Sequence, residues 1–211
     1  FEGLPDAGTR HRAGPPVLLH SGIVYPAERD PSALFAALGR LAASERIRPG
    51  DFVIRFRASV HEDLLRRLAS EQRVEGFVEI LPPIPYRDAL REMLDADALL
   101  VMQGANCNEQ IPAKLYEYLR AGRPILGLAD PRGDTGRTLA TLGYPFVTKL
   151  ESTDEIEAAL PDFIRALGAG PLPVAGREIA DRYSRRRLTG RLASLLDAIA
   201  GSGAPASWRQ E

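Results

Sequence analysis

Two glutamates, Glu109 and Glu117, have the spacing that points most directly to chemistry, with seven residues between them. Glu109 closes a polar loop, 103–109, which follows an apolar run. In open α/β sheets, ligands bind at the carboxyl ends of strands, and free N–H groups at a helix start attract anions. A ligand that meets both an anion site and Glu109 must also offer neutral groups such as sugar hydroxyls. A structural explanation stays open, with Glu109 facing the helix dipole and Glu117 paired with Lys114.

The elements around these glutamates read as a strand, a helix and a strand. Apolar runs at 98–102 and 125–128 flank a helical pattern, which is typical of buried parallel strands joined by a crossover helix. Its apolar positions recur at helical spacing and would pack on the sheet: Ile111, Leu115, Tyr118 and Leu119. Gln110 and Glu117 would share another face of the same helix, with Pro112 in its first turn.

The same alternation of strands and helices covers most of the chain. Strands are predicted at 17–22, 52–57, 78–81, 98–103, 124–129 and 145–149. Helices are predicted from an Asp30-Pro31 start to about 42, then at 61–72, 86–95, from 109 to about 121, in a short piece ending near 142, and at 155–167 and 178–199. Residues 130–136 are predicted to form a loop. This order predicts a three-layer, Rossmann-like α/β domain with a six-stranded parallel sheet and helices on both faces.

Composition limits the classes of function. The net charge of −1 over 211 residues gives no electrostatic reason to expect nucleic acid or an anionic membrane as partner. The single cysteine, Cys107, cannot form a disulfide within the chain and suits a reducing compartment, so a cytoplasmic protein is expected. No apolar run reaches the roughly 20 residues of a transmembrane helix. Three dispersed histidines give no zinc-binding spacing, and no metal is expected.

The two ends differ from the middle. Residues 1–16 are rich in Gly, Pro and polar residues and lack an initiator Met, which is typical of a linker from a missing N-terminal domain. The folded domain is expected to span 17–199, and 200–211 to form a flexible tail.

The segment from Pro112 to Ile125 reads Pro-x-Lys-x-x-Glu-Tyr-x-x-x-Gly-x-Pro-Ile, and Glu109 and Glu117 form a Glu-x7-Glu pair. This resembles the nucleotide-sugar-binding, C-terminal half of retaining GT-B glycosyltransferases of family 4 (group 1). The resemblance covers about 17–199. It implies that Glu109, the catalytic candidate, approaches the donor sugar, while Glu117 holds the ribose hydroxyls.

The same resemblance implies partners. The donor would be a sugar nucleotide such as a UDP- or GDP-sugar, used as substrate, with no further cofactor. The acceptor, a sugar, a lipid or another small molecule, would bind the chain's own N-terminal domain, which could also hold the protein at the inner face of a membrane. Polysaccharide biosynthesis is the expected setting, and the 211 residues alone are expected to transfer nothing.

The loop after the first strand departs from the family pattern. The family has Gly-Arg there and a Lys further on, two cations that neutralise the donor diphosphate. Here Gly22 is followed by Ile23, and Arg29 takes the Lys position. Lys114, Arg55 or Arg57 could replace the missing cation; these are open alternatives.

Other expected contacts follow from position. Helix-start residues would hold the phosphates: Gln110, Ile111, Ala113 and Lys114. The backbone of Ile84, in a Pro-rich turn after the third strand, would read the base. The family's Gly-x-Gly-like turn after the second strand is replaced here by 57–59. His20, which ends the first strand, is a further candidate site residue, and Asp134-Thr135 is expected to cap the short helix.

Two alternatives remain at this point. A GT-B sugar-nucleotide epimerase or hydrolase would share the fold but needs acid and base partners that the sequence does not identify. A non-catalytic, flavodoxin-like binding module would instead carry a phosphate loop after its first strand, where 21–24 is mostly apolar.

Overall fold

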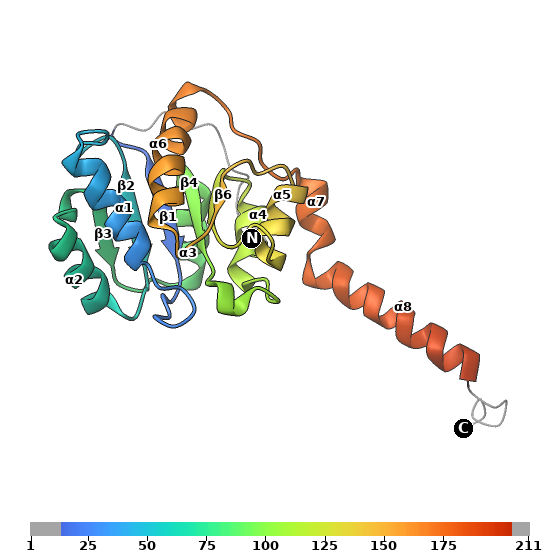
Figure 1. Cartoon of the computed structure of the whole chain (residues 1–211). Helices are drawn as coiled ribbons and strands as arrows, with labels where there is room; N and C mark the ends of the chain where they lie inside the picture. Colours follow the sequence, from blue (N-terminus) through green and yellow to red (C-terminus); the bar gives the residue numbers. More distant parts are fainter. Residues whose placement is uncertain (1–13, 204–211) are drawn as a thin grey trace. The chain divides into compact units, whose positions relative to one another are not determined.

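The computed structural model describes residues 14–203 (Figure 1). The chain divides between Ala175 and Gly176 into two compact units. The expected linker, 1–16, lies almost wholly outside the described residues, as does most of the expected tail, 200–211. Within that tail, 201–203 are helical.

The first unit is built on a six-stranded sheet in which every neighbouring pair is parallel. Its strands are β1 (Val17–Ser21), β2 (Val53–Arg57), β3 (Val78–Leu81), β4 (Ala98–Met102), β5 (Ile125–Leu128) and β6 (Val147–Thr148). Their order is β3-β2-β1-β4-β5-β6. The predicted sheet is therefore confirmed. This order is that of dinucleotide-binding domains and differs from the flavodoxin-like order, so the flavodoxin-like alternative is wrong about the fold.

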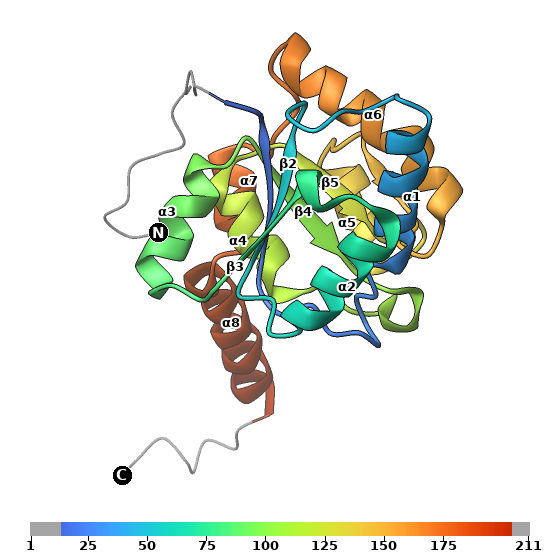
Figure 2. The ribbon, with the colours of Figure 1, turned by 90° about the vertical axis from the view of Figure 1, so that its left-hand side faces the viewer.

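Helices cover both faces of the sheet (Figure 2). On one face α1 (Ser32–Ala43) packs against α2 (Glu62–Gln72) and α6 (Thr153–Ala169). On the other, α3 (Tyr86–Asp95) packs against α4 (Ala113–Ala121). The helix α5 (Asp134–Thr141) packs beside β6, and short 3-10 turns η1 (Glu75–Phe77) and η2 (Ala105–Cys107) precede β3 and α4.

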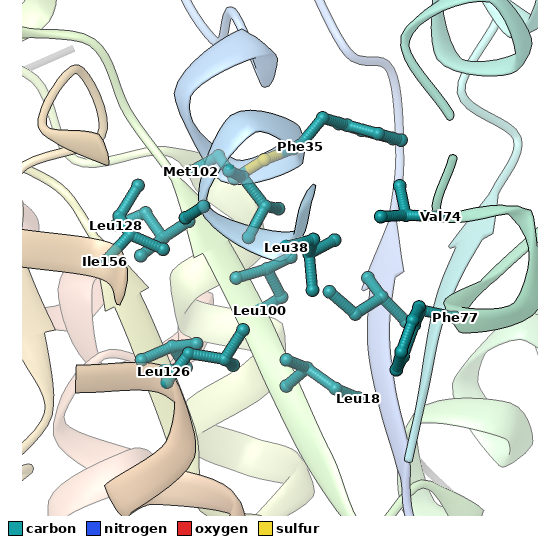
Figure 3. Packing of buried hydrophobic residues seen from close by; sticks show 14 of the residues in the cluster. Leu18, Phe35, Leu38, Val74, Phe77, Leu100, Met102, Leu126, Leu128 and Ile156 are labelled. Carbon is teal, nitrogen blue, oxygen red and sulfur yellow. The ribbon is translucent and has the colours of Figure 1, made fainter. Parts of the chain in front are cut away.

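The core lies between the sheet and the α1–α2–α6 layer (Figure 3). Leu18 and Leu100 come from the central strands, and Leu38 and Ile156 reach them from α1 and α6. All five residues of β1 and all five of β4 are buried, as expected for central strands covered on both sides. Their near-continuous apolar character made these strands visible in the sequence.

The described part of the second unit consists of α7 (Arg177–Arg182) and α8 (Arg185–Gly203). The helix predicted at 178–199 is therefore present but divided in two at 183–184. Leu188, Leu192, Leu195 and Ile199 are exposed along α8. No helix among residues 14–203 is long and apolar enough to cross a membrane.

The central strands β1 and β4 pair along only a short part of their length. β1 pairs with β2 along five residues, from Val17 to Ser21. With β4 it pairs only at Leu18 and Leu19. Beyond these pairs the backbone N–H of Ser21 donates instead to the hydroxyl of Tyr118, on α4, at 2.8 Å. The sheet therefore opens where its strand order reverses, the position at which open α/β sheets bind ligands.

The start of the central helix corrects the prediction. The helix α4 begins at Ala113, not at 109, so Glu109 and Gln110 precede it and Gln110 does not share a helix face with Glu117. Pro112, which was predicted in the first turn, is instead the N-cap residue with an extended ψ of 136°. The proline ring also disfavours helical geometry at the preceding residue, which keeps 109–111 out of the helix. The apolar stripe is otherwise confirmed, because Leu115, Tyr118 and Leu119 are buried.

A second correction concerns 130–136. This segment was predicted as a loop, but α5 begins within it at Asp134. Asp134 does not cap the helix, since Gly133 is the N-cap residue and makes no side-chain cap. Instead Asp134 pairs with Arg137 at 2.5 Å, and Thr135 Oγ1 donates to the carbonyl of Gln110 at 3.0 Å.

Candidate functional site

A cavity of about 300 Å³ opens where β1 and β4 separate. Its volume lies at the lower end of the range for small-molecule sites. Its lining comes from β1 and the following loop, and from β4 and the start of α4: His20, Gly22, Ile23, Tyr25, Arg29, Leu100, Val101, Met102, Pro112, Ala113, Lys114 and Tyr118. We call it the β1–β4 cavity. Four of the predicted site residues, Gly22, Arg29, Ala113 and Lys114, come together in it.

Two cations line this cavity, Arg29 and Lys114. Arg29 Nη1 donates to the carbonyl of Ile23 at 3.1 Å, and its guanidinium lies 5.3 Å from the centre of the Tyr25 ring. Lys114 Nζ pairs with Glu117 Oε2 at 2.8 Å, and its side chain stays 37% exposed. Two partly solvated cations at a cavity wall favour an anionic ligand over a neutral one.

The other two candidate cations lie elsewhere. Arg57 Nε pairs with Glu92 Oε2 at 2.8 Å, and this carboxylate raises the pKa of Arg57. Arg55 pairs with Glu79 at 2.7 Å and with Glu92 at 3.3 Å. Because both guanidiniums are already engaged beneath α3, Lys114 is the cation that joins Arg29 in the β1–β4 cavity.

Gly22 allows the close approach of Lys114. Its φ is +143°, and a Cβ placed there would lie 3.2 Å from Lys114 Cε. Its N–H donates to the carbonyl of Arg57 at 2.9 Å, which ties the loop to the end of β2. A larger residue here would therefore push Lys114 away or strain the loop.

The start of α4 adds free backbone donors. Within the described residues, the N–H groups of Ala113 and Lys114 have no hydrogen-bond partner, and both residues line the cavity. The N–H of Gln110 is not available, because it donates to the carbonyl of Cys107 at 3.0 Å. The set of free helix-start amides is therefore smaller than the sequence suggested, and it carries the positive end of the helix dipole into the cavity.

The remaining predicted site residues lie outside the cavity lining. Glu109 is exposed in the turn before Pro112, and within residues 14–203 its carboxylate forms no hydrogen bond or ion pair. Glu117 is half-buried and accepts from Lys114 and, at 3.3 Å, from the Tyr86 hydroxyl. Ile111 is half-buried in the same turn. Ile84 lines a separate cavity of about 240 Å³ under α3.

Hydrogen bonds join the loop after β1 to the loop after β4 at the carboxyl end of the sheet. Gly104 N–H donates to the carbonyl of Glu28 at 2.6 Å, and Asn106 Nδ2 donates to that of Ala27 at 2.8 Å. Farther along, Asn108 Nδ2 donates to Asp130 Oδ2 at 2.9 Å. The Arg132 N–H and this amide lower the pKa of Asp130. The loop that carries Glu109 is thus anchored at both ends by neighbouring loops.

Buried polar atoms without partners gather at this edge. Three such side-chain atoms among the described residues lie at or just beyond the carboxyl ends of β1, β2 and β4: His20 Nε2, Ser59 Oγ and Gln103 Oε1. Since a buried unpaired polar atom costs about 1–3 kcal/mol, their gathering at one edge indicates a functional surface.

The sequence did not show the roles of Tyr118 and Gln103. Tyr118 was assigned only to packing, but its hydroxyl also accepts the bond from Ser21. Burial raises the pKa of Tyr118, so the phenol stays protonated. Gln103 Nε2 donates to the carbonyl of Cys107 at 3.0 Å. The only sign of the role of Gln103 in the sequence was its position, as a polar residue directly after a buried strand. Residues 14–203 contain no group of three or more His, Cys, Asp or Glu side chains placed to hold a metal ion.

Comparison with solved structures shows that the chain has a known fold. The galactosyltransferase WaaB of the lipopolysaccharide outer core matches with a TM-score of 0.64 and 17% identity, over 94% of this chain and 52% of that protein. Sucrose-phosphate synthase from Thermosynechococcus elongatus matches with a TM-score of 0.63 and 13% identity, over 90% and 46%. The fold is that of GT-B C-terminal domains. The chain therefore spans about half the length of the structures that it matches.

Two further neighbours share this fold. Alr3699/HepE from Anabaena, solved with UDP and glucose, has a TM-score of 0.62 at 14% identity, over 88% of this chain and 49% of that protein. A putative UDP-N-acetylglucosamine 2-epimerase from Listeria monocytogenes has a TM-score of 0.51 at 12% identity, over 91% and 47%. No family model matches the chain. No curated protein matches its sequence either.

Proposed function

We propose that this chain is the donor-binding half of a retaining glycosyltransferase, which takes a nucleoside diphosphate sugar as donor. The observation that carries the proposal is the β1–β4 cavity, where Arg29, Lys114 and the free amide of Ala113 surround one space at the switch point of the sheet. A diphosphate matches these donors in charge and hydrogen-bonding capacity. A neighbour of the same fold was solved with UDP and glucose, which supports this ligand class.

The other predicted site residues bind the parts of the donor on either side of the diphosphate. In this proposal Glu117, one turn beyond Lys114, holds the ribose hydroxyls, and the backbone of Ile84 pairs with the base. Glu109 meets the donor sugar from the exposed turn before α4. The leaving diphosphate gains negative charge during transfer, and the two cavity cations stabilise it. The acceptor, a sugar, a lipid or a small molecule, would bind a second domain, because the chain covers only half of its structural neighbours.

An epimerase is the second candidate, because one neighbour is a putative 2-epimerase. Such chemistry needs an acid and a base beside the sugar. The lining of the β1–β4 cavity contains no carboxylate, and burial lowers the pKa of its only histidine, His20, to about 4. These residues support binding and charge stabilisation better than proton transfer. Product analysis with an NDP-sugar, with and without an acceptor, separates the two activities.

The first test is calorimetric titration of the 211-residue chain with UDP, GDP and ADP. The chain offers a matched pair, since its two lysines are Lys114 in the cavity and Lys149, which pairs with Glu155 at 3.4 Å. Lys114→Gln should weaken nucleotide binding about tenfold and reduce its salt dependence, because it removes one charge–phosphate contact. Lys149→Gln should leave both unchanged. Equal effects of the two substitutions would refute the placement of the diphosphate.

Glu117→Gln tests the ribose contact. Removing a carboxylate beside Lys114 increases the positive potential, so pyrophosphate should bind equally or more tightly. A nucleoside diphosphate should bind several-fold more weakly, since one of the two oxygens that accept from the ribose hydroxyls becomes an amide NH2 that cannot accept. If both ligands bind more tightly, Glu117 only forms the ion pair with Lys114, and the ribose assignment is wrong.

A further inference from the structure

His20 occupies an unusual position for a titratable side chain. It lies in β1 just beyond the last pair with β4, only 5% of its surface is exposed, and it lines the β1–β4 cavity. Its ring lies 5.9 Å from that of Phe56, tilted by 53°. A histidine in this place needs hydrogen-bond partners for both ring nitrogens, since it is cut off from bulk water.

The hydrogen bonds of His20 define its tautomer. Nδ1 lies 3.0 Å from the carbonyl oxygen of Leu100, which can only accept, so Nδ1 carries a proton. Burial is the main cause that lowers the pKa of His20 to about 4, and Arg29 and Lys114 lower it further. The ring is therefore neutral at pH 7, and Nε2 presents a lone pair.

Among the described residues, no group donates a hydrogen bond to this lone pair. The carbonyl of Ile23 raises the pKa of His20 slightly, but as an acceptor it cannot donate to the lone pair, and it accepts a hydrogen bond from Arg29. Nε2 can thus only accept a hydrogen, and it requires a ligand that donates one. An ionised diphosphate has oxygen acceptors and no hydrogen to offer, whereas the hydroxyls of a sugar can donate.

We infer that His20 is a specificity-determining residue of the β1–β4 cavity, whose Nε2 accepts a hydrogen bond from a hydroxyl group of the bound nucleotide or nucleotide sugar. The inference rests on the proposed function, because Arg29 and Lys114 must bind the phosphates for a hydroxyl to reach the ring. It adds a contact that distinguishes a hydroxylated ligand from a bare phosphate. The hydroxyl belongs either to the ribose or to the transferred sugar.

Two substitutions of His20 test the roles of its two ring nitrogens separately. In His20→Asn the side-chain amide can take the place of Nδ1 and keep the bond to Leu100, while the acceptor is lost. In His20→Gln the longer side chain can place an amide oxygen near the position of Nε2. Both are titrated with pyrophosphate, with the nucleoside diphosphate that the unchanged chain binds best, and with its glucose ester. Urea unfolding of each variant checks that it folds.

We expect His20→Asn to bind pyrophosphate like the unchanged chain and to bind the hydroxylated ligand about tenfold more weakly, with partial recovery in His20→Gln. A loss already seen with the nucleoside diphosphate assigns the hydroxyl to the ribose. A loss seen only with the glucose ester assigns it to the sugar. Equal weakening of pyrophosphate, or no weakening of any ligand, overturns the inference.

The protonation state gives an independent readout. Nitrogen-15 spectra of the His20 ring should show the neutral Nδ1–H tautomer before and after ligand is added, and calorimetry in two buffers should show no proton uptake by His20. Formation of an imidazolium on binding would mean that Nε2 donates to a phosphate, which overturns the inference. If the unchanged chain binds no nucleotide, the proposed function and this inference fail together. If Lys114→Gln weakens binding and His20→Asn does not, only this inference fails.

Discussion

A buried histidine such as His20 links the stability of the fold to pH. Its folded pKa of about 4 lies below the ordinary value of 6.5, because burial and the facing cations Arg29 and Lys114 disfavour the imidazolium. The unfolded chain therefore takes up a proton first as the pH falls. The stability due to neutral His20 is complete above pH 6.5 and is lost as the pH falls toward 4.

This predicts a pH-dependent difference between the unchanged chain and His20→Asn. Across the window from pH 6.5 to 4, the unchanged chain should lose roughly 3 kcal/mol more of its unfolding free energy than the variant. Urea titrations at several pH values measure it. Asp130 and Glu155, whose pKa values are lowered by hydrogen bonds, titrate in both proteins and cancel in the difference. Parallel pH profiles would contradict the assigned pKa.

Single residues also mark what the sequence could not show. Ala58 and Val60 have φ values of +57° and +67°, in the left-handed region that neither side chain favours. The sequence lacks the glycines that would favour such values. Two backbone hydrogen bonds to distant segments hold this loop: Ala58 N–H donates to the carbonyl of Leu81, and Val24 N–H to that of Ser59.

Between elements, the bond from Ser21 to Tyr118 joins the open end of β1 to α4. Tyr118→Phe would leave the buried Ser21 N–H without its acceptor and should lower the unfolding free energy by about 1–3 kcal/mol. Chemical denaturation measures the change.

Tyr25→Phe is the matched control for Tyr118→Phe. Among residues 14–203 the Tyr25 hydroxyl makes no hydrogen bond, and the remaining ring keeps its place beside Arg29. This substitution should change stability by less than about 0.5 kcal/mol. Equal losses in both variants would show that the Tyr118 hydroxyl contributes nothing specific.

The helix α5 depends on a glycine for its packing. A Cβ on Gly136 would lie 2.3 Å from the backbone oxygen of Asp130 and 2.7 Å from Pro131 Cα. Gly136→Ala should therefore destabilise the protein by about 2 kcal/mol or more, although alanine favours helices. Gly190→Ala, in α8 with nothing within 4 Å, should instead raise helicity, as circular dichroism can show. A stabilising Gly136→Ala would refute the close approach.

At this scale the sequence predicted most strands and helices, because their apolar periodicity is itself the cause of burial. The bounds 86–95 and 78–81 agree with the structure. The misplaced starts of α4 and α5 have different reasons. At α4, Pro112 was placed in the first helical turn but is the extended residue before the helix, which is a local effect. At α5, Gly136 was taken as part of a loop but lies within the helix, where its backbone closely approaches that of Asp130. Among the residues that line the β1–β4 cavity, the sequence named Gly22 and Arg29 from the family pattern, and Ala113 and Lys114 from their place at the helix start. It did not predict the hydrogen bond of Tyr118.

For the whole molecule, the main hydrophobic cluster lies within the first unit. The clustered core residues and those packed on them lie between Leu18 and Leu172, and the compact unit ends at Ala175. A chain that stops at Ala175 should therefore still unfold cooperatively, with a thermal midpoint within a few degrees of the intact chain. Calorimetric scans of both chains test this. Loss of a cooperative transition in the shorter chain would show that α7 and α8 are required for the fold.

The short pairing between β1 and β4 has a mechanical consequence. Two residue pairs join β1 to β4, as two join β5 to β6 at the edge of the sheet, whereas four or five join the other neighbours. The sheet is thus two half-sheets with a weak central seam, and the β1–β4 cavity lies along that seam. A ligand held by Arg29 on one side and Lys114 on the other spans both halves. Its binding would act as a clamp, so amide exchange along β1 and β4 should slow together when the cavity is filled.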